Sequence, residues 1–285
     1  MSKSILDTIL DPQSLSVCFQ PIFRFQNGVR SVDSLEALIR GPRDTKFMRA
    51  DILFDYVRRK KAEAAVDQSC FTAICDAATR LPLDLRININ VHAATLGHRS
   101  DFIEFFKKQA KRRSLDLERF TLEIVEHAPT CNVPLLTQNI AELRACGVRI
   151  ALDDVGLGQS NYRMMLDCHP QYFKLDAYFV RDLGSDLKRR AVVESLVILA
   201  ATLESAVVAE GATVESDLDH LASMGVRLVQ ANLLCPALPL EELQRLGHVA
   251  LSPALDAGYG QMANGGVRAY EPAKIGLGAA FGEYR

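Results

Sequence analysis

Two adjacent carboxylates, Asp153 and Asp154, end an apolar run and precede a loop that contains glycine. The run has the length of a buried strand, and glycine lets a backbone pass close to a ligand. Neighbouring acids at a strand end repel each other unless a positive charge lies between them, and a divalent cation is the usual solution. The alternative is that the pair caps a helix that begins near Ser160. Ligands elsewhere in the chain decide between the two interpretations.

Polar side chains also lie in or just after most of the other apolar runs. A buried polar group without a partner is costly, so a whole series of them indicates a shared purpose. The series contains acids, amides and one lysine but no cysteine or histidine: Glu36, Asn90, Glu123, Glu126, Lys174, Asp176, Glu210 and Gln230. Hard oxygen ligands favour Mg²⁺, Mn²⁺ or Ca²⁺. The carboxylates exceed the need of one Mg²⁺, which indicates two cations about 3.5–4 Å apart and phosphoester hydrolysis.

The runs that carry these residues alternate with segments of helical spacing. We predict strands over 16–25, 34–40, 86–91, 120–125, 148–152, 172–175, 206–209 and 226–229. We predict helices over 50–60, 62–79, 103–109, 133–146, 161–166, 187–203, 215–224 and 240–246. This alternation predicts parallel strands and a (β/α)8 TIM-like barrel, whose catalytic groups gather at the C-terminal ends of the strands. A doubly wound sheet is the alternative, but the first strand lacks its Gly-rich phosphate turn.

The ends of the chain differ from this alternating region. We interpret residues 1–15 as a polar lead-in with a helix over 5–10, residues 16–250 as the barrel, and residues 251–285 as an irregular, glycine-rich tail. The N-terminus is too polar for a signal peptide and no apolar run has the length of a membrane span, so we expect a cytoplasmic protein. Seven scattered cysteines without a CxxC pair predict buried free thiols in that compartment.

Composition excludes some classes of function. The chain has 285 residues, of which 48% are hydrophobic and 24% charged, as is typical of a globular protein. Its net charge is −2, which gives no electrostatic reason to expect DNA, RNA or a membrane surface as a partner.

Taken together, the motifs resemble those of the EAL-domain family, phosphodiesterases that hydrolyse cyclic di-GMP. The family's name comes from the motif present here as Glu36-Ala37-Leu38. The likeness extends from Phe19 to about Pro239, and it includes NVH at Asn90, EIVE from Glu123 to Glu126, ALDDVGLGQS, FKLD around Lys174, AEGA around Glu210 and the strand that ends at Gln230. The resemblance implies the EAL type of TIM-like barrel.

The resemblance also implies a role for each matching residue. The ligands of a first cation correspond to Glu36, Asn90, Glu123 and Asp153. Asp153 is implied to bridge to a second cation, which is bound by Asp154 with Glu210 as a further ligand or general base. Lys174 matches the lysine that holds the attacking water, and Gln230 a glutamine that supports the site. The implied substrate contacts are Gln20, Leu38 and Arg40, and Glu126 is implied to anchor the loop after the two aspartates through Ser160.

The activity that follows from the resemblance is metal-dependent. The implied cofactors are two Mg²⁺ or Mn²⁺ ions per site, with Ca²⁺ expected to support binding but to inhibit turnover, since its looser geometry places the water badly. The substrate would be cyclic di-GMP and the product linear pGpG, in a bacterial pathway of the kind that controls biofilm formation and motility. A homodimer and an unidentified regulatory protein remain open as further partners.

Several positions depart from the family's usual pattern. Val155 and Leu157 stand where the loop usually has an aromatic residue and a hydroxyl, and Val125 replaces a threonine. Ala231 replaces a glycine, and Gly41 replaces a tryptophan. These changes leave the implied ligands intact but favour a second hypothesis, a weak or inactive protein that acts as a cyclic di-GMP receptor or as a protein-interaction module. A third hypothesis is an unrelated Mg²⁺-dependent barrel enzyme such as an aldolase.

Overall fold

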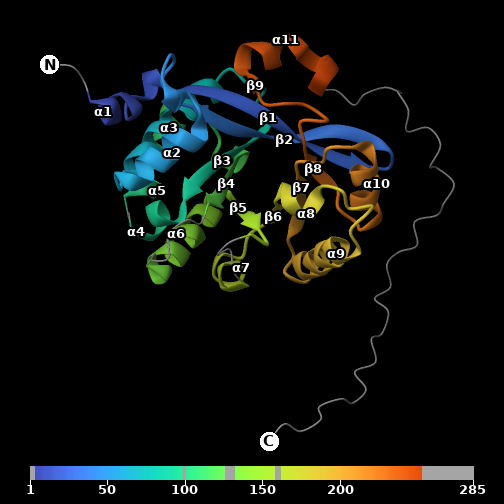
Figure 1. Ribbon diagram of the computed structural model, residues 1–285. Helices are drawn as coiled ribbons and strands as arrows, with labels where there is room; N and C mark the ends of the chain where they lie inside the picture. Colours follow the sequence, from blue (N-terminus) through green and yellow to red (C-terminus); the bar gives the residue numbers. More distant parts are fainter. Residues whose placement is uncertain (1–3, 99–100, 126–131, 158–161, 252–285) are drawn as a thin grey trace, which may run out of the picture. The chain divides into compact units, whose positions relative to one another are not determined.

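The computed structural model describes residues 4–98, 101–125, 132–157 and 162–251, with side chains to residue 245. The chain divides into two units, Met1–Ala254 and Leu255–Arg285, of which the second lies outside the described residues. The predicted tail therefore falls almost wholly outside them. Figure 1 shows the first unit, in which helices surround a central set of strands.

The central set of strands is a closed barrel. Its strands are β1 Ser16–Gln26, β2 Val29–Arg40, β3 Arg86–His92, β4 Phe120–Val125, β5 Arg149–Val155, β6 Tyr172–Leu175, β7 Ala206–Glu210 and β8 Leu228–Gln230. The strands from β2 to β8 pair in parallel in chain order, and β1 closes the barrel by pairing with both β2 and β8. A short strand, β9 Leu238–Pro239, pairs antiparallel with the N-terminal part of β1 at Cys18 and Phe19. The predicted (β/α)8 TIM-like barrel is confirmed.

The direction of β1 corrects the expectation of parallel strands throughout. β1 runs antiparallel to both of its barrel neighbours. The reason is the link to β2, which consists of Asn27 and Gly28 alone, with φ of 53° and 77°. Two left-handed residues of this kind form a tight hairpin turn, and a turn so short can only reverse the chain. The last strand also begins later than predicted, at Leu228 instead of Val226.

The helices match the predicted ones within a few residues. They are α1 Ile5–Ile9, α2 Ala50–Arg59, α3 Glu63–Ala78, α5 Phe102–Arg112, α6 Val133–Ala145, α7 Tyr162–Cys168, α9 Leu187–Thr202, α10 Glu215–Ser223 and α11 Leu240–Leu251. Two short helices were not predicted, α4 Ala93–His98 and α8 Ala177–Val180. Both begin directly or one residue after a strand end, where the sequence has too few residues for a helical period to be recognised.

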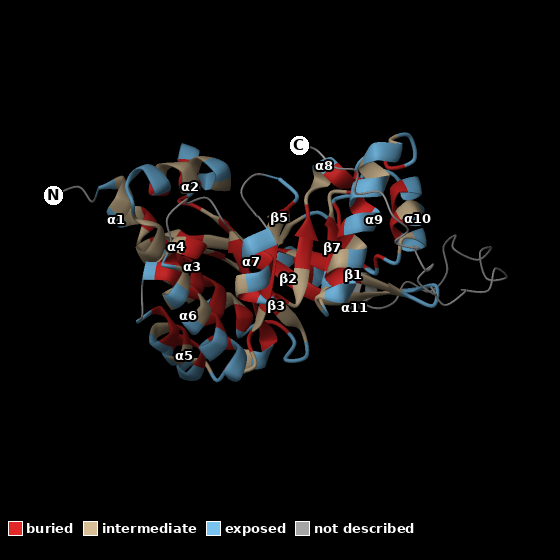
Figure 2. Cartoon of the chain, turned by 90° about the horizontal axis from the view of Figure 1, so that it is seen from below, coloured by how far each residue is buried: buried red, intermediate tan, exposed pale blue. Residues whose placement is uncertain are grey.

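Alternation along each strand separates an apolar outer layer from a polar barrel interior. In β4, Phe120, Leu122 and Ile124 pack against the helices, whereas Thr121 and Glu123 share the opposite face. Figure 2 shows the buried strands and the buried faces of the helices that cover them. The buried polar residues of the barrel strands are Ser34, Glu36, Asn88, Thr121, Glu123, Lys174 and Gln230. The barrel interior thus holds buried charged and amide side chains together with a small apolar cluster of Ile22, Val208 and Leu228.

Three further findings bear on the sequence analysis. Across the described residues, no helix combines the length and apolar character needed to cross a membrane. Six of the cysteines are free thiols; Cys70, Cys75, Cys168 and Cys235 are buried as predicted, whereas Cys18 and Cys146 are only partly buried. Cys131 lies outside the described residues.

Candidate active site

The Lys174 ammonium lies at the centre of four carboxylates that come from four different strands. Its Nζ is 2.6 Å from Glu123 Oε2, 2.7 Å from Glu210 Oε1, 3.2 Å from Glu36 Oε2 and 3.3 Å from Asp153 Oδ1. The lysine side chain is only 2% exposed and that of Glu123 is fully buried. Parallel strands bring their C-terminal ends to one edge of a barrel, which is how Glu36 and Glu210, 174 positions apart in the chain, meet here. The structure brings these five predicted site residues together.

Amide side chains hold the carboxylates on their other sides. Asn90 Nδ2 donates to Glu36 Oε1 at 2.7 Å, and Gln230 Nε2 donates to Glu36 Oε2 at 2.7 Å. Asn88 Nδ2 donates to Glu123 Oε1 at 2.7 Å. Amide donors fix the directions of carboxylate oxygens without adding charge. The two acids are therefore held in position by neutral groups, and Lys174 is the cation in direct contact with both.

One lysine cannot neutralise four carboxylates, and the pKa values reflect this. Burial and the neighbouring charge of Glu36 raise the pKa of Glu123 well above its usual value, although Lys174 opposes the shift. Burial likewise raises the pKa of Glu210 to about 8 against the pull of Lys174. For Glu36, burial is outweighed by Lys174 and by the amide hydrogen bonds, so its pKa is lowered. Burial would lower the pKa of Lys174, but the four carboxylates raise it well above its usual value.

The two aspartates belong to β5 rather than to a helix cap. The pairing between β5 and β6 shifts register between Leu152 and Val155, so a bulge lies at Asp153 and Asp154. Adjacent residues of a regular strand face opposite sides, and a bulge is the usual way to redirect one of them. Asp154 adopts a left-handed φ of 52°, which is uncommon for a residue other than glycine and costs backbone energy. The strand thus departs from regular geometry at the acidic pair itself.

Gly156 completes this irregular strand end. Its φ is +96°, and a Cβ at this position would lie 2.7 Å from the Phe179 ring. Both the backbone conformation and the close ring require glycine. The backbone at Gly156, just after Asp154, therefore lies close against Phe179 of α8.

The site fits divalent cations in its chemistry. Within the described residues, no three acidic, cysteine or histidine side chains surround a common point suited to a metal, because the carboxylates turn toward Lys174 instead. The donor set consists only of oxygen, and its four buried or partly buried carboxylates carry more negative charge than one ammonium balances. Gln230 Oε1 is also a buried acceptor without a hydrogen-bond partner among the described residues. Oxygen ligands with excess negative charge suit Mg²⁺ or Mn²⁺.

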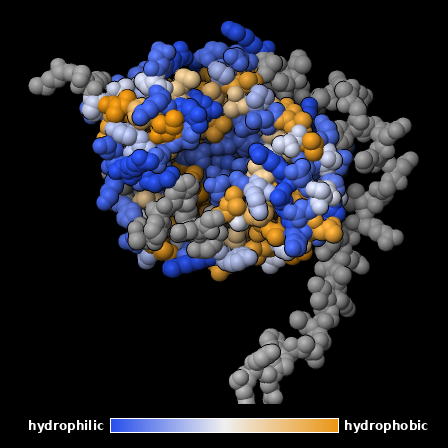
Figure 3. Space-filling model, viewed as in Figure 1, coloured by the Kyte–Doolittle hydropathy of each residue, from blue (hydrophilic) through white to orange (hydrophobic). Residues whose placement is uncertain are grey.

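The predicted substrate contacts lie beside the carboxylates on β1 and β2. Every second residue of β2 shares one face, and Glu36, Leu38 and Arg40 lie on the same face for this reason. Leu38 and Arg40 are partly buried. Gln20 is paired with Glu36 across the hairpin. The face of the molecule shown in Figure 3 has a central hollow whose visible walls are hydrophilic.

A chain of amides leads from Glu36 to the exposed Asn232. Gln20 Nε2 donates to the Cys235 carbonyl at 3.2 Å and to Asn232 Oδ1 at 3.1 Å. Gln20 Oε1 accepts from Gln230 Nε2 at 3.0 Å, and the same nitrogen reaches Glu36. The carbonyl can only accept, so it determines which way both glutamine amides point.

Some predicted residues cannot be placed, and two contacting residues were missed. Glu126 and Ser160, the predicted loop anchor, lie outside the described residues. Asn90 belongs to a recognisable motif and Asn88 does not, although the alternation of RININV puts both on one face of β3. Asn232 was also missed, and no sequence pattern marked it.

The departures from the family's pattern are accommodated by packing. Val155 is 1% exposed and pairs with Leu175 of β6, so it contributes to the core. Leu157 is 36% exposed and reaches the surface. At Gly41, an added Cβ would overlap the Phe47 carbonyl and lie 2.5 Å from Leu53. Neighbouring backbone thus fills the space that a side chain would need there.

Comparison with known proteins places this geometry in a family. The family model described as the EAL domain matches residues 3–237, which is most of the chain. The chain is 27% identical over 253 residues to the cyclic di-GMP phosphodiesterase NbdA of Pseudomonas aeruginosa, covering 86% of this chain and 31% of the relative. It is 28% identical over 160 residues to the bifunctional diguanylate cyclase/cyclic di-GMP phosphodiesterase MucR of the same organism, covering 56% of this chain and 23% of the relative. The chain spans less than a third of the length of these curated relatives.

Solved structures agree with the fold. The MucR phosphodiesterase in complex with c-di-GMP has a TM-score of 0.73 at 23% identity, covering 84% of this chain and 97% of that one. The manganese/cy-diGMP complex of Klebsiella pneumoniae BlrP1 has a TM-score of 0.71 at 26% identity, covering 80% of this chain and 57% of that one.

Proposed function

This chain belongs to the EAL domain family, and we propose that it hydrolyses cyclic di-GMP to linear pGpG with two Mg²⁺ or Mn²⁺ ions. The observation that carries the proposal is the convergence of carboxylates from four strands on the buried Lys174. The named activity of relatives such as NbdA and the manganese complex of BlrP1 support it. Burying this many charged groups costs free energy, and binding a charged ligand among them would offset that cost.

The residues divide into two sets of ligands. Glu36, Asn90, Glu123 and Asp153 would hold one cation, and Asp153, Asp154 and Glu210 the other. When bound, the cations would supply Lewis-acid activation of a water molecule and of the phosphate. Ca²⁺ would occupy the same ligands but support turnover poorly, because it accepts a looser geometry.

The chain's own groups would position the substrate and the water. The Lys174 ammonium faces four carboxylates here, so a donor to the attacking water would become free when cations share those carboxylates. Arg40, on the same face of β2 as Glu36, suits a phosphate with its planar guanidinium, and Leu38 between them offers an apolar contact. Gln20 and Gln230 keep Glu36 in place through the amide chain.

The test is the formation of pGpG from cyclic di-GMP by the purified chain with Mn²⁺ or Mg²⁺. We expect product from the unaltered chain and at least about a hundredfold less from Glu36→Gln, because losing a cation ligand should cost at least as much as losing a group that orients one. Glu104→Gln, an exposed change on α5, is the matched control and should retain full turnover. Tight cyclic di-GMP binding without product would instead support the receptor hypothesis.

A further inference from the structure

Asn88 lies inside the barrel, directly beneath one of the buried carboxylates. It is 4% exposed and occupies the third position of β3, two residues before Asn90. Two residues along a strand amount to about 6.6 Å, so Asn88 lies deeper in the barrel than the predicted ligand Asn90. Both asparagines face inward and each donates to a carboxylate on a neighbouring strand, Asn90 to Glu36 and Asn88 to Glu123.

The two oxygens of Glu123 have different partners. Oε1 accepts from Asn88 Nδ2 at 2.7 Å, and Oε2 accepts from Lys174 Nζ at 2.6 Å. A carboxylate held at both oxygens cannot rotate about its last torsion without losing one of these bonds. The contact with Asn88 therefore restrains the plane of the Glu123 carboxylate and keeps its second oxygen directed at Lys174.

The orientation of the Asn88 amide follows from its partner. A carboxylate can only accept, so Nδ2 must face Glu123 and Oδ1 must face away. Oδ1 is buried and has no hydrogen-bond partner among the described residues. An unpaired buried acceptor costs about 1–3 kcal/mol. An apolar side chain here would avoid that cost, which indicates that the donor to Glu123 has a use.

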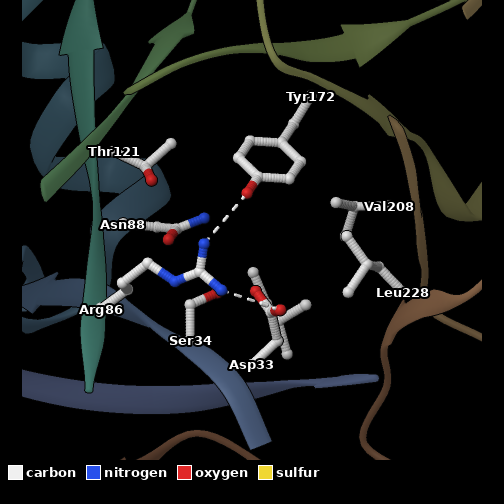
Figure 4. Close-up of a pocket in the computed structure, with 9 residues that line it drawn as sticks. Asp33, Ser34, Arg86, Asn88, Thr121, Tyr172, Val208 and Leu228 are labelled. Carbon is white, nitrogen blue, oxygen red and sulfur yellow. Dashed lines mark hydrogen bonds and ion pairs between the residues drawn. The ribbon is translucent and has the colours of Figure 1, made fainter. Parts of the chain in front are cut away.

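The far side of Asn88 borders a small pocket at the other end of the barrel interior. The pocket is lined by Ile22, Asp33, Ser34, Arg86, Asn88, Thr121, Tyr172, Val208 and Leu228. Figure 4 shows Arg86 beside Asn88, with its guanidinium donating hydrogen bonds to both Asp33 and Tyr172.

We propose that Asn88 is a positioning residue of the metal site, which fixes Glu123 from within the barrel and so raises the affinity of the site for divalent cations. This inference rests on the proposed function, because Glu123 is there a cation ligand. Groups that orient ligands from behind typically contribute ten- to a hundredfold in metal affinity. The effect on affinity separates this role from a general contribution to folding.

The test is Mn²⁺ binding, measured by the loss of the electron paramagnetic resonance signal of free Mn²⁺. We expect Asn88→Ala to weaken binding about ten- to a hundredfold. Asn88→Leu, which keeps the branching at Cγ but lacks the donor, should weaken it similarly and serves if the alanine variant does not fold. Turnover of both variants should rise toward that of the unaltered chain as Mn²⁺ is increased, which a merely structural defect would not allow.

Thr121→Ala is the matched control. Thr121 is paired with Asn88 in the β3–β4 register, is 1% exposed and lines the same pocket. It should bind Mn²⁺ like the unaltered chain. The inference is overturned if folded Asn88 variants bind Mn²⁺ within twofold of the unaltered chain, or if Thr121→Ala loses as much. Failure of the unaltered chain to bind Mn²⁺ would overturn the proposed function as well.

Discussion

The four carboxylates around Lys174 outnumber the single positive charge of its ammonium group, and the pKa values of the site follow from this imbalance. The lysine's own burial should disfavour its positive charge, yet the surrounding acids keep its pKa well above the usual value. The acids are not balanced in return, since the pKa values of Glu123 and Glu210 are both raised. Divalent cations would remove this imbalance, because each adds two positive charges among oxygen ligands.

Gln20 offers a test of the amide chain. In Gln20→Glu the new carboxylate cannot donate, so it would face the Cys235 carbonyl and Asn232 Oδ1 with repulsion instead of hydrogen bonds. We expect at least about a tenfold fall in kcat/KM, equal to about 1.4 kcal/mol of transition-state stabilisation. Steady-state kinetics with cyclic di-GMP measure it.

Asn232→Ala is the comparison for Gln20→Glu. It removes one acceptor but leaves the Cys235 carbonyl to orient Gln20, so the fall in kcat/KM should be several times smaller. Equal losses in the two variants would show that the direction of the glutamine amide is unimportant.

At this scale, the sequence identified most of the residues that the structure brings together. Acids and amides after apolar runs are visible because burial makes them costly. Asn88 was missed because no motif contained it, and its role depends on a distance of 2.7 Å to a residue on another strand. Asn232 was missed because its contact with Gln20 joins residues far apart in the chain.

Among the elements, α3 is tied to the end of β3 and the start of α4 by one buried acid. Asp67 accepts from the His92 backbone at 3.0 Å, from His92 Nδ1 at 2.8 Å and from the Thr95 hydroxyl. Asp67→Ala should lower the free energy of unfolding by about 3 kcal/mol, the cost of removing one partner from a buried charged pair. Chemical denaturation measures it.

Asp76 on the same helix provides the control for Asp67. Its salt bridge to Arg113 spans 2.6 Å, but its side chain is 50% exposed. Asp76→Ala should therefore cost less than about 1 kcal/mol. If both variants lose the same stability, burial of Asp67 does not govern its contribution.

The end of β5 links an element to the chemistry. Gly156→Ala would force a side chain toward the Phe179 ring and a strained backbone, displacing the strand end that carries Asp154. We expect turnover to fall at least about tenfold, since small displacements of catalytic groups are costly. A matched change at Gly28 in the β1–β2 turn, Gly28→Ala, meets no atom within 4 Å and should leave turnover intact. Unchanged turnover in Gly156→Ala would contradict this role.

The elements themselves were largely predictable. Strands with β-branched and aromatic runs, such as Phe120–Val125, have sharp limits, and the structure reproduces them. The direction of β1 was not inferred, because the turn at Asn27 and Gly28 outweighs the general preference of alternating elements for parallel pairing. The bulge at Asp153 and Asp154 depends on pairing with β6, which a single strand's sequence does not contain.

For the whole molecule, the core protects two of the free thiols. Burial raises the pKa of Cys75 to about 12 and that of Cys70 well above its usual value. At about pH 8 both thiols remain protonated and inaccessible, so iodoacetamide should leave them unmodified in the native chain. Peptide mass spectrometry should find both fully modified after denaturation. Modification of native Cys70 or Cys75 at the rate of an exposed thiol would contradict the packing of α3.

The proposed reaction is the opening of cyclic di-GMP by a water molecule activated in this barrel. Its most direct test is to incubate the unaltered chain with cyclic di-GMP and Mn²⁺ in water labelled with heavy oxygen, and to analyse the products by mass spectrometry. We expect pGpG that carries one heavy oxygen in its new terminal phosphate, and no product when EDTA removes the metal. Unchanged cyclic di-GMP in the presence of Mn²⁺, or pGpG without the label, would contradict it.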